Sequence, residues 1–190
     1  MMILCYLRFF LFFVLATVAS YAAYCLPPDG TPYAFAACGI GIIYGIFGIV
    51  GGFELEMGIV KGVVEDFLDF APLGLMNIEI FTAAGESYAM VHALFLIPLL
   101  LDLVAKLFGE EDDDQATQTL KYIDILAGVS SLLYLCYAKE NYMYAAVALS
   151  CLAAHSSMLI GGKCAAIWWE YAYLVFHSSF YFASTLALAK

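Results

Sequence analysis

Four ionisable residues stand inside apolar stretches of the chain: Asp102, Asp124, His155 and Glu170. A charge at the centre of a bilayer costs a few kcal/mol, so an ionisable residue within a membrane segment indicates function by default. Counted from the nearest segment end at 1.5 Å per residue, all four lie roughly 6 to 9 Å below the same membrane face. Such a polar layer would be a cation site or a stage in a proton path, with His155 titrating nearest neutrality.

Each carboxyl of this layer also has a simpler interpretation. A lysine one turn away neutralises an acid on a helix, and a shallow charge reaches the membrane surface by extending its side chain. The sequence favours this structural interpretation, because charges near the surface cost less than charges at the centre. The partners would be as follows: Lys106 for Asp102, Lys121 for Asp124, and the ring pair Trp168 and Trp169 beside Glu170.

No residue pattern predicts catalysis, a metal or a cofactor. G-x-S-x-G, H-E-x-x-H and the phosphate-binding G-x-x-x-x-G-K-[ST] are all absent from the sequence. His92 and His177 differ by about 10 Å in expected depth, which disfavours a shared haem. We expect these two imidazoles to be hydrogen-bonded inside the bundle, with serines such as Ser178 as partners.

The amino-acid composition indicates that much of the protein is surrounded by lipid rather than water. Of the 190 residues, 65% are apolar and 13% charged, and the mean hydropathy is +0.91. Soluble domains are about 45 to 50% apolar and about 25% charged. The sequence therefore predicts an integral membrane protein with the lipid bilayer as a partner. The net charge of −10 excludes nucleic acid, which binds through clustered Lys and Arg.

Runs of about 20 apolar residues predict an all-α fold, a polytopic transmembrane helix bundle forming one membrane domain over residues 1–190. Alternatively, the first run is a cleaved signal peptide, which leaves five spans. Short connections make the last three spans antiparallel neighbours. The six predicted spans are 2–25, 34–53, 87–108, 120–138, 142–160 and 165–189.

Three further segments complete the domain. Residues 54–70 continue the second span as an amphipathic helix, which we expect to end at Pro72. Residues 72–86 are apolar but short, and we interpret them as interfacial or re-entrant. Residues 109–118 form an acidic loop that includes Glu110 to Asp114. Because blocks of like charge repel, this loop is expected to be solvated, with capture of a cation as the alternative.

Small residues recur along the second predicted span at spacings of three and four, which places them on one stripe of a helix. Stripes of this kind let two helix backbones approach closely in lipid. We call this stripe the small-residue seam and expect another helix to pack on it. Its members are Ala34, Cys38, Gly41, Gly45, Gly48 and Gly52.

The cysteines and the basic residues give weaker predictions, about a disulfide and about the orientation in the membrane. The six cysteines are widely spaced, and one disulfide among Cys25, Cys38 and Cys164 is possible if their membrane face is oxidising. With six spans, the two sides carry four and three basic residues, too even a split to set orientation. We expect a plasma membrane or endomembrane location with both termini in the cytoplasm.

Two functions follow as hypotheses. The seam, the short loops and the lack of a sizeable soluble domain favour a structural or assembly subunit, either self-associating or bound to other membrane subunits. The alternative is a small ion or proton channel or transporter that uses the carboxylate and histidine layer.

Overall fold

The computed structural model describes residues 2–51, 58–107, 114–164 and 166–189, and all regular structure within them is helical. The all-α class is therefore confirmed. Seven helices occupy this part of the chain: α1 (Met2–Cys25), α2 (Pro32–Gly51), α3 (Gly58–Ala83), α4 (Val91–Leu107), α5 (Asp114–Lys139), α6 (Tyr142–Cys164) and α7 (Ala166–Leu188).

Three stretches within these helices are long and apolar enough to cross a membrane: Tyr6–Cys25, Pro32–Val50 and Gln118–Lys139. The outer faces of the bundle also carry large apolar side chains, including Phe13, Leu101 and Leu126, each more than half exposed. Water would not tolerate so much exposed apolar surface, whereas lipid favours it. The protein is thus a helical, membrane-associated chain.

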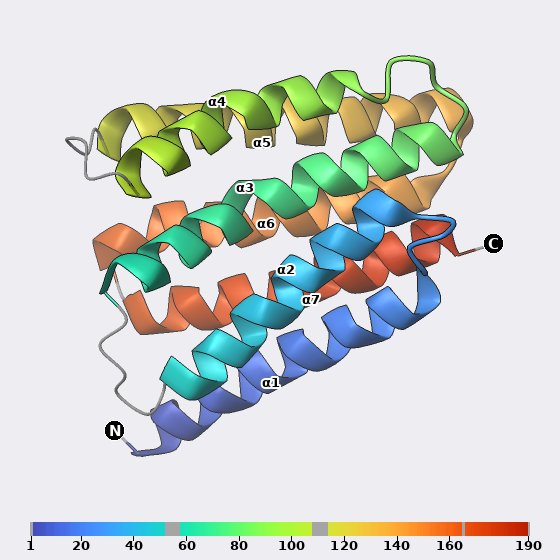
Figure 1. The fold of residues 1–190 in the computed structure, drawn as a ribbon. Helices are drawn as coiled ribbons and strands as arrows, with labels where there is room; N and C mark the ends of the chain where they lie inside the picture. The colour runs from blue at the N-terminus through green and yellow to red at the C-terminus, as the bar shows by residue number, and fades with distance from the viewer. Residues whose placement is uncertain (1, 52–57, 108–113, 165, 190) are drawn as a thin grey trace.

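The helices run side by side along a common direction, and helices that follow each other in sequence are packed neighbours (Figure 1). Helix α1 packs on α2 and α7, while α3 contacts α2, α4, α5 and α7. Residues 70–81 of α3 are buried except for Leu75, which is partly exposed. The second half of α3 is therefore the central rod of the bundle.

The sequence prediction for this central rod was wrong in two ways. Helix α3 continues through Pro72 to Ala83, so Pro72 does not end it, and residues 72–83 belong to one long helix rather than to a separate short segment. Proline removes one backbone hydrogen bond, but close packing by neighbouring helices stabilises a helix across such a gap. The single rod predicted from residue 34 to residue 70 is instead two packed helices, and residues 52–57 lie outside the described part of the chain.

Helix α3 is additional to the six predicted spans, so the number of long helices in the described chain is odd instead of even. The N-terminus and the C-terminus lie at opposite ends of the helices (Figure 1), whereas six spans would have brought them to the same end. The remaining predicted spans each coincide with one helix, although α4 begins at Val91 and α6 extends through Gly161 and Gly162 to Cys164. Residues 109–113 of the predicted acidic loop lie outside the described residues, whereas residues 114–118, also predicted as loop, form the start of α5.

The small-residue seam of α2 faces other helices of the same chain. A Cβ added to Gly41 would lie 2.6 Å from the Tyr181 ring, and one added to Gly45 would lie 2.7 Å from the Ala16 Cβ. The same addition at Gly48 would collide with the Phe12 ring. The partner helices are therefore α1 and α7, not a second protein. Ala34 and Cys38 are fully buried, and Gly52 lies outside the described residues.

Gly45→Ala tests this close approach. The new Cβ would lie 2.9 Å from the backbone nitrogen of Ala16, and a backbone cannot move aside as a side chain can. We expect a loss of about 1 to 3 kcal/mol of stability, the usual cost of overpacking. Gly39→Ala is the matched control, since no atom lies within 4 Å of its added Cβ. It should gain up to about 1 kcal/mol from helix propensity.

Thermal unfolding of the two purified variants in detergent measures both effects. Equal melting temperatures for Gly45→Ala and Gly39→Ala would mean that α1 does not approach α2 at this point.

Candidate functional site

A cluster of buried ionisable residues lies on three helices that are consecutive in the chain. Asp124 of α5 and His155 of α6 are both buried, and their side chains are close enough to interact electrostatically. His177, near the middle of α7, joins them with its ring centroid 6.1 Å from that of His155. This cluster of Asp124, His155 and His177 is called the polar core below. It combines one carboxyl with two imidazoles among apolar helices.

One nitrogen of His155 is held by the backbone. Its Nδ1 lies 2.9 Å from the carbonyl oxygen of Cys151, one turn earlier on α6. A carbonyl oxygen only accepts hydrogen bonds, so Nδ1 must carry the hydrogen. Protonation and deprotonation of this imidazole therefore take place at Nε2.

The nitrogens of His177 have no hydrogen-bond partner among the described residues, although the side chain is only 2% exposed. The expected serine partners bond elsewhere: Ser178 donates to Leu174 O, and Ser179 donates to Val175 O. In a helix, a serine hydroxyl readily bonds the carbonyl one turn earlier. The expectation of a hydrogen-bonded His177 was therefore wrong. One oxygen of Asp124, Oδ2, also lacks a partner in the described chain.

Polar and aromatic side chains extend the polar core along α7. Tyr173, His177, Tyr181 and Ser184 are spaced by four, four and three residues, which places them on one face of the helix. All four are buried. The His177 ring centroid lies 5.0 Å from that of Tyr173 and 5.6 Å from that of Tyr181. We call these four residues the inner face of α7. Their spacing was visible in the sequence, but the pattern was missed.

The polar layer predicted from sequence is only partly assembled. Asp124 and His155 come together, whereas Glu170 lies near the start of α7 and forms an ion pair with Arg8 at 2.8 Å. The interpretation of Glu170 as a surface-seeking charge beside Trp168 therefore omitted its real partner, a cation on α1. The side chain of Asp102 lies outside the described residues. Within the described part of the chain, no three His, Cys, Asp or Glu side chains converge as metal ligands.

Two polar residues of α3 hold the bundle together and were not singled out from the sequence. Glu79 is 4% exposed, and its Oε2 accepts hydrogen bonds from the backbone N–H groups of Tyr33 (2.9 Å) and Ala34 (3.3 Å). It therefore caps the N-terminus of α2, where free N–H groups and the helix dipole favour an anion. Asn77 donates to the carbonyl of Gly128 on α5 at 3.2 Å.

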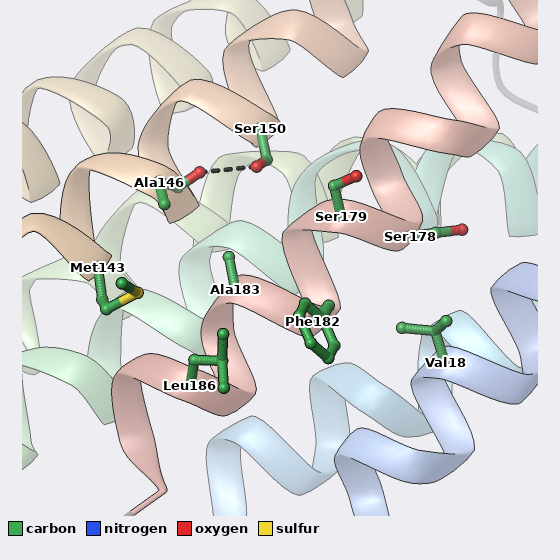
Figure 2. Close-up of a pocket in the computed structure, with 9 residues that line it drawn as sticks. All are labelled: Val18, Met143, Ala146, Ser150, Ser178, Ser179, Phe182, Ala183 and Leu186. Atoms are coloured by element: carbon green, nitrogen blue, oxygen red, sulfur yellow. Dashed lines mark hydrogen bonds between the residues drawn. The ribbon is translucent and has the colours of Figure 1, made fainter.

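An apolar groove opens on the outer surface between α1, α6 and α7 (Figure 2). Its volume is about 420 Å³. The hydroxyl groups of its serines are bonded to carbonyls of their own helices; Ser150, for example, donates to Ala146 O at 2.7 Å. Its lining residues are Val18, Met143, Ala146, Ser150, Ser178, Ser179, Phe182, Ala183 and Leu186. None belongs to the polar core, so the groove is a separate feature.

The disulfide considered from sequence is not formed between Cys25 and Cys38, which are both free thiols. The side chain of Cys164 lies outside the described residues.

A further polar contact joins the end of α5 to the connection between α3 and α4. Lys139, the last residue of α5, donates to Glu86, which lies between α3 and α4, at a distance of 2.9 Å.

Comparison with known proteins gives a family but no activity. The model of a family described as "Domain of unknown function (DUF4791)" matches residues 28–188. That range spans α2 to α7 and most of the 190 residues, so the chain belongs to this family. Neither a curated protein nor a solved structure matches the chain.

Glu79→Gln is expected to lower stability by about 1 to 2 kcal/mol. The amide keeps one acceptor oxygen for the N–H groups of Tyr33 and Ala34 but loses the charge that the helix N-terminus favours. Denaturant unfolding in detergent micelles measures the loss. Glu140→Gln, at an exposed site between α5 and α6, is the control and should unfold like the wild type. Unchanged unfolding of Glu79→Gln would exclude the capping role.

The pair of Glu86 and Lys139 predicts a pH dependence. The hydrogen bond from the Lys139 ammonium holds the pKa of the Glu86 carboxyl below its ordinary value. A lowered pKa in the folded state stabilises the protein above about pH 4.3, the ordinary value for Glu, and this contribution disappears as the pH falls through the folded-state pKa.

Lys139→Met should therefore flatten the dependence of melting temperature on pH between about pH 5 and pH 3. Because the pair is partly exposed, high salt should reduce the difference between variant and wild type. A variant that loses stability equally at pH 3 and pH 7 would show that the ion pair is not the cause.

Proposed function

We propose that this member of the DUF4791 family is an integral membrane protein of seven spans that moves a small cation across the bilayer. The hydrocarbon core of a bilayer is about 30 Å thick. At 1.5 Å per residue, the shortest helix, α4 with 17 residues, is about 26 Å long, and α3 with 26 residues is about 39 Å long. Side-by-side rods of these lengths suit a membrane, and an odd number of spans would put the termini on opposite sides.

The observation that carries the proposal is the polar core in the middle of the bundle. Asp124 and His177 each present polar atoms that no described residue satisfies. Burial of such groups without partners costs roughly 1 to 3 kcal/mol each on the protein scale. A purely structural core would gain stability from apolar residues in their place. Ionisable groups retained inside a membrane bundle typically mark ion or proton pathways.

Assembly through the small-residue seam has weaker support. Gly41, Gly45 and Gly48 contact Tyr181, Ala16 and Phe12 of the same chain. A partner protein would have to displace α1 or α7 to reach them. The seam therefore serves the packing of this chain, and an assembly role would require a different, lipid-facing surface. The proposal includes no catalytic activity.

Cation flux into liposomes that contain the purified full-length protein tests the proposal. We expect flux above that of protein-free liposomes, and a loss of about tenfold or more in Asp124→Asn, because removal of an intramembrane charge changes the energy of a cation by more than about 1.4 kcal/mol. His92→Gln is the matched control, since His92 is also buried but packs on Phe81, with ring centroids 4.6 Å apart.

Folded Asp124→Asn that conducts like the wild type would overturn the assignment of the polar core. Wild-type liposomes without any cation flux would overturn the transport proposal itself.

A further inference from the structure

We infer that the transported cation is a proton, and that it crosses the bundle along the inner face of α7 after loading at Asp124 and His155. This inference rests on the proposed function and names its substrate. It follows from three features of the bundle: unbroken helices around the polar core, one defined exchanging nitrogen, and a line of hydroxyl and imidazole groups.

The first feature argues against a dehydrated metal cation. Sodium, potassium and calcium ions need several oxygen ligands to replace their water, and membrane proteins supply these from carbonyls of broken helices or rings of side chains. Helices α5, α6 and α7 run without a break past Asp124, His155 and His177, so their backbone carbonyls there are engaged in helical hydrogen bonds. No metal-ligand set converges in the described chain. A proton needs only groups that exchange it.

The second feature defines where exchange occurs. Cys151 O fixes the hydrogen on His155 Nδ1, so Nε2 accepts the proton of the Asp124 carboxyl. The O–H bond of Asp124 breaks and an N–H bond forms at Nε2, which leaves a carboxylate beside an imidazolium. The imidazolium then transfers that proton to a nitrogen of His177, and the Asp124 carboxylate takes up the next proton. His177 in turn passes its extra proton to the next group of the route. All three groups then return to their starting states, and no electrons are transferred.

The third feature extends the route beyond the polar core. Tyrosine hydroxyls both donate and accept hydrogen bonds, as a relay requires. Tyr173 and Tyr181 flank His177 on the inner face of α7, with the ring distances given above, and Ser184 Oγ has no partner among the described residues. The Tyr181 hydroxyl donates to Ala37 O at 3.1 Å, which orients it inside the bundle. Transfer between these groups requires rotation of a ring or a bridging water.

Other titratable groups surround this route and will influence its dependence on pH. They are Lys121 of α5, which is buried one turn before Asp124, Cys151 of α6, and Cys38 of α2, which interacts electrostatically with Tyr181. The positive charge of Lys121 would disfavour a hydrated metal cation at Asp124 by electrostatic repulsion.

Proton uptake into liposomes tests the inference directly. The full-length protein is reconstituted with a pH-sensitive dye inside, and a potassium gradient with valinomycin sets the membrane potential. We expect rapid acidification with the wild type and a loss of about tenfold or more in His177→Leu, because leucine cannot carry a proton. Tyr181→Phe should slow uptake, whereas Tyr171→Phe, a buried tyrosine on another face of α7, should leave the rate unchanged.

His177→Leu also separates a relay from a structural role. Replacement of an imidazole without partners by an apolar side chain of similar size should leave the melting temperature equal or higher. A structural histidine would instead lower it while the flux of the folded fraction persisted. That second result would overturn the inference.

Two outcomes separate this inference from the proposed function. If wild-type liposomes carry sodium or potassium and the dye reports no proton uptake, the cation is not a proton and only this inference fails. If no cation and no proton crosses, both fail. A wild-type rate that is the same in heavy water and in ordinary water would also contradict a proton route, and this measurement needs no variant.

Discussion

The close approach of α1, α2 and α7 at the glycines of α2 is the contact on which the rest of the bundle depends. In lipid, apolar side chains gain nothing by leaving their solvent, so helices associate through tight van der Waals contact. Gly45 admits the backbone of α1 at Ala16, and Gly41 admits the Tyr181 ring of α7. Tyr181 then donates to Ala37 O. The same contact that joins the three helices therefore buries Tyr181 of the inner face of α7.

Polar groups inside the bundle fall into two kinds. Glu79 and Asn77 of α3 each bond to the backbone of a neighbouring helix, and the serines of α6 and α7 bond to carbonyls of their own helices. These groups offset their burial by hydrogen bonds and strengthen the packing. His177 and the Oδ2 atom of Asp124 have no such compensation in the described chain. Asn77 Oδ1 and Ser184 Oγ also lack a partner in the described chain. An unsatisfied group that is also ionisable is therefore what distinguishes a candidate for transport from a structural polar residue.

The family match and the fold agree in extent. Residues 28–188 include every helix from α2 to α7, while α1 lies before them. Helix α1 nevertheless fills the seam at Gly45 and Gly48 and anchors α7 through the pair of Arg8 and Glu170. The transport proposal relies on α5, α6 and α7, whose polar core lies wholly within the matched range. The groove on the outer surface shares α6 and α7 with that core but none of its residues.

Sequence reasoning succeeded where a property is local. The 65% apolar composition and the length of the apolar runs determined a helical membrane-associated chain, because the backbone in lipid must satisfy its own hydrogen bonds. It failed at Pro72, where local propensity predicted a helix end. There, the packing of α2, α4, α5 and α7 around residues 70–81 sustains the helix. Because α3 is an additional long helix, the described chain has seven helices instead of the six predicted spans. Glu170 and Lys139 therefore each lie at the opposite end of the bundle from the one that six spans predict.

The sequence alone thus determined the helical class, most of the helices other than α3, the small-residue stripe and two members of the polar core, Asp124 and His155. Hydropathy and helical spacing depend only on neighbouring residues. Only the tertiary structure decided that α1 and α7 fill the stripe, that Arg8 takes Glu170, and that His177 lies 6.1 Å from His155. These outcomes depend on which helices are neighbours in space. That choice is made by the shapes of surfaces far apart in sequence, and no local pattern encodes it.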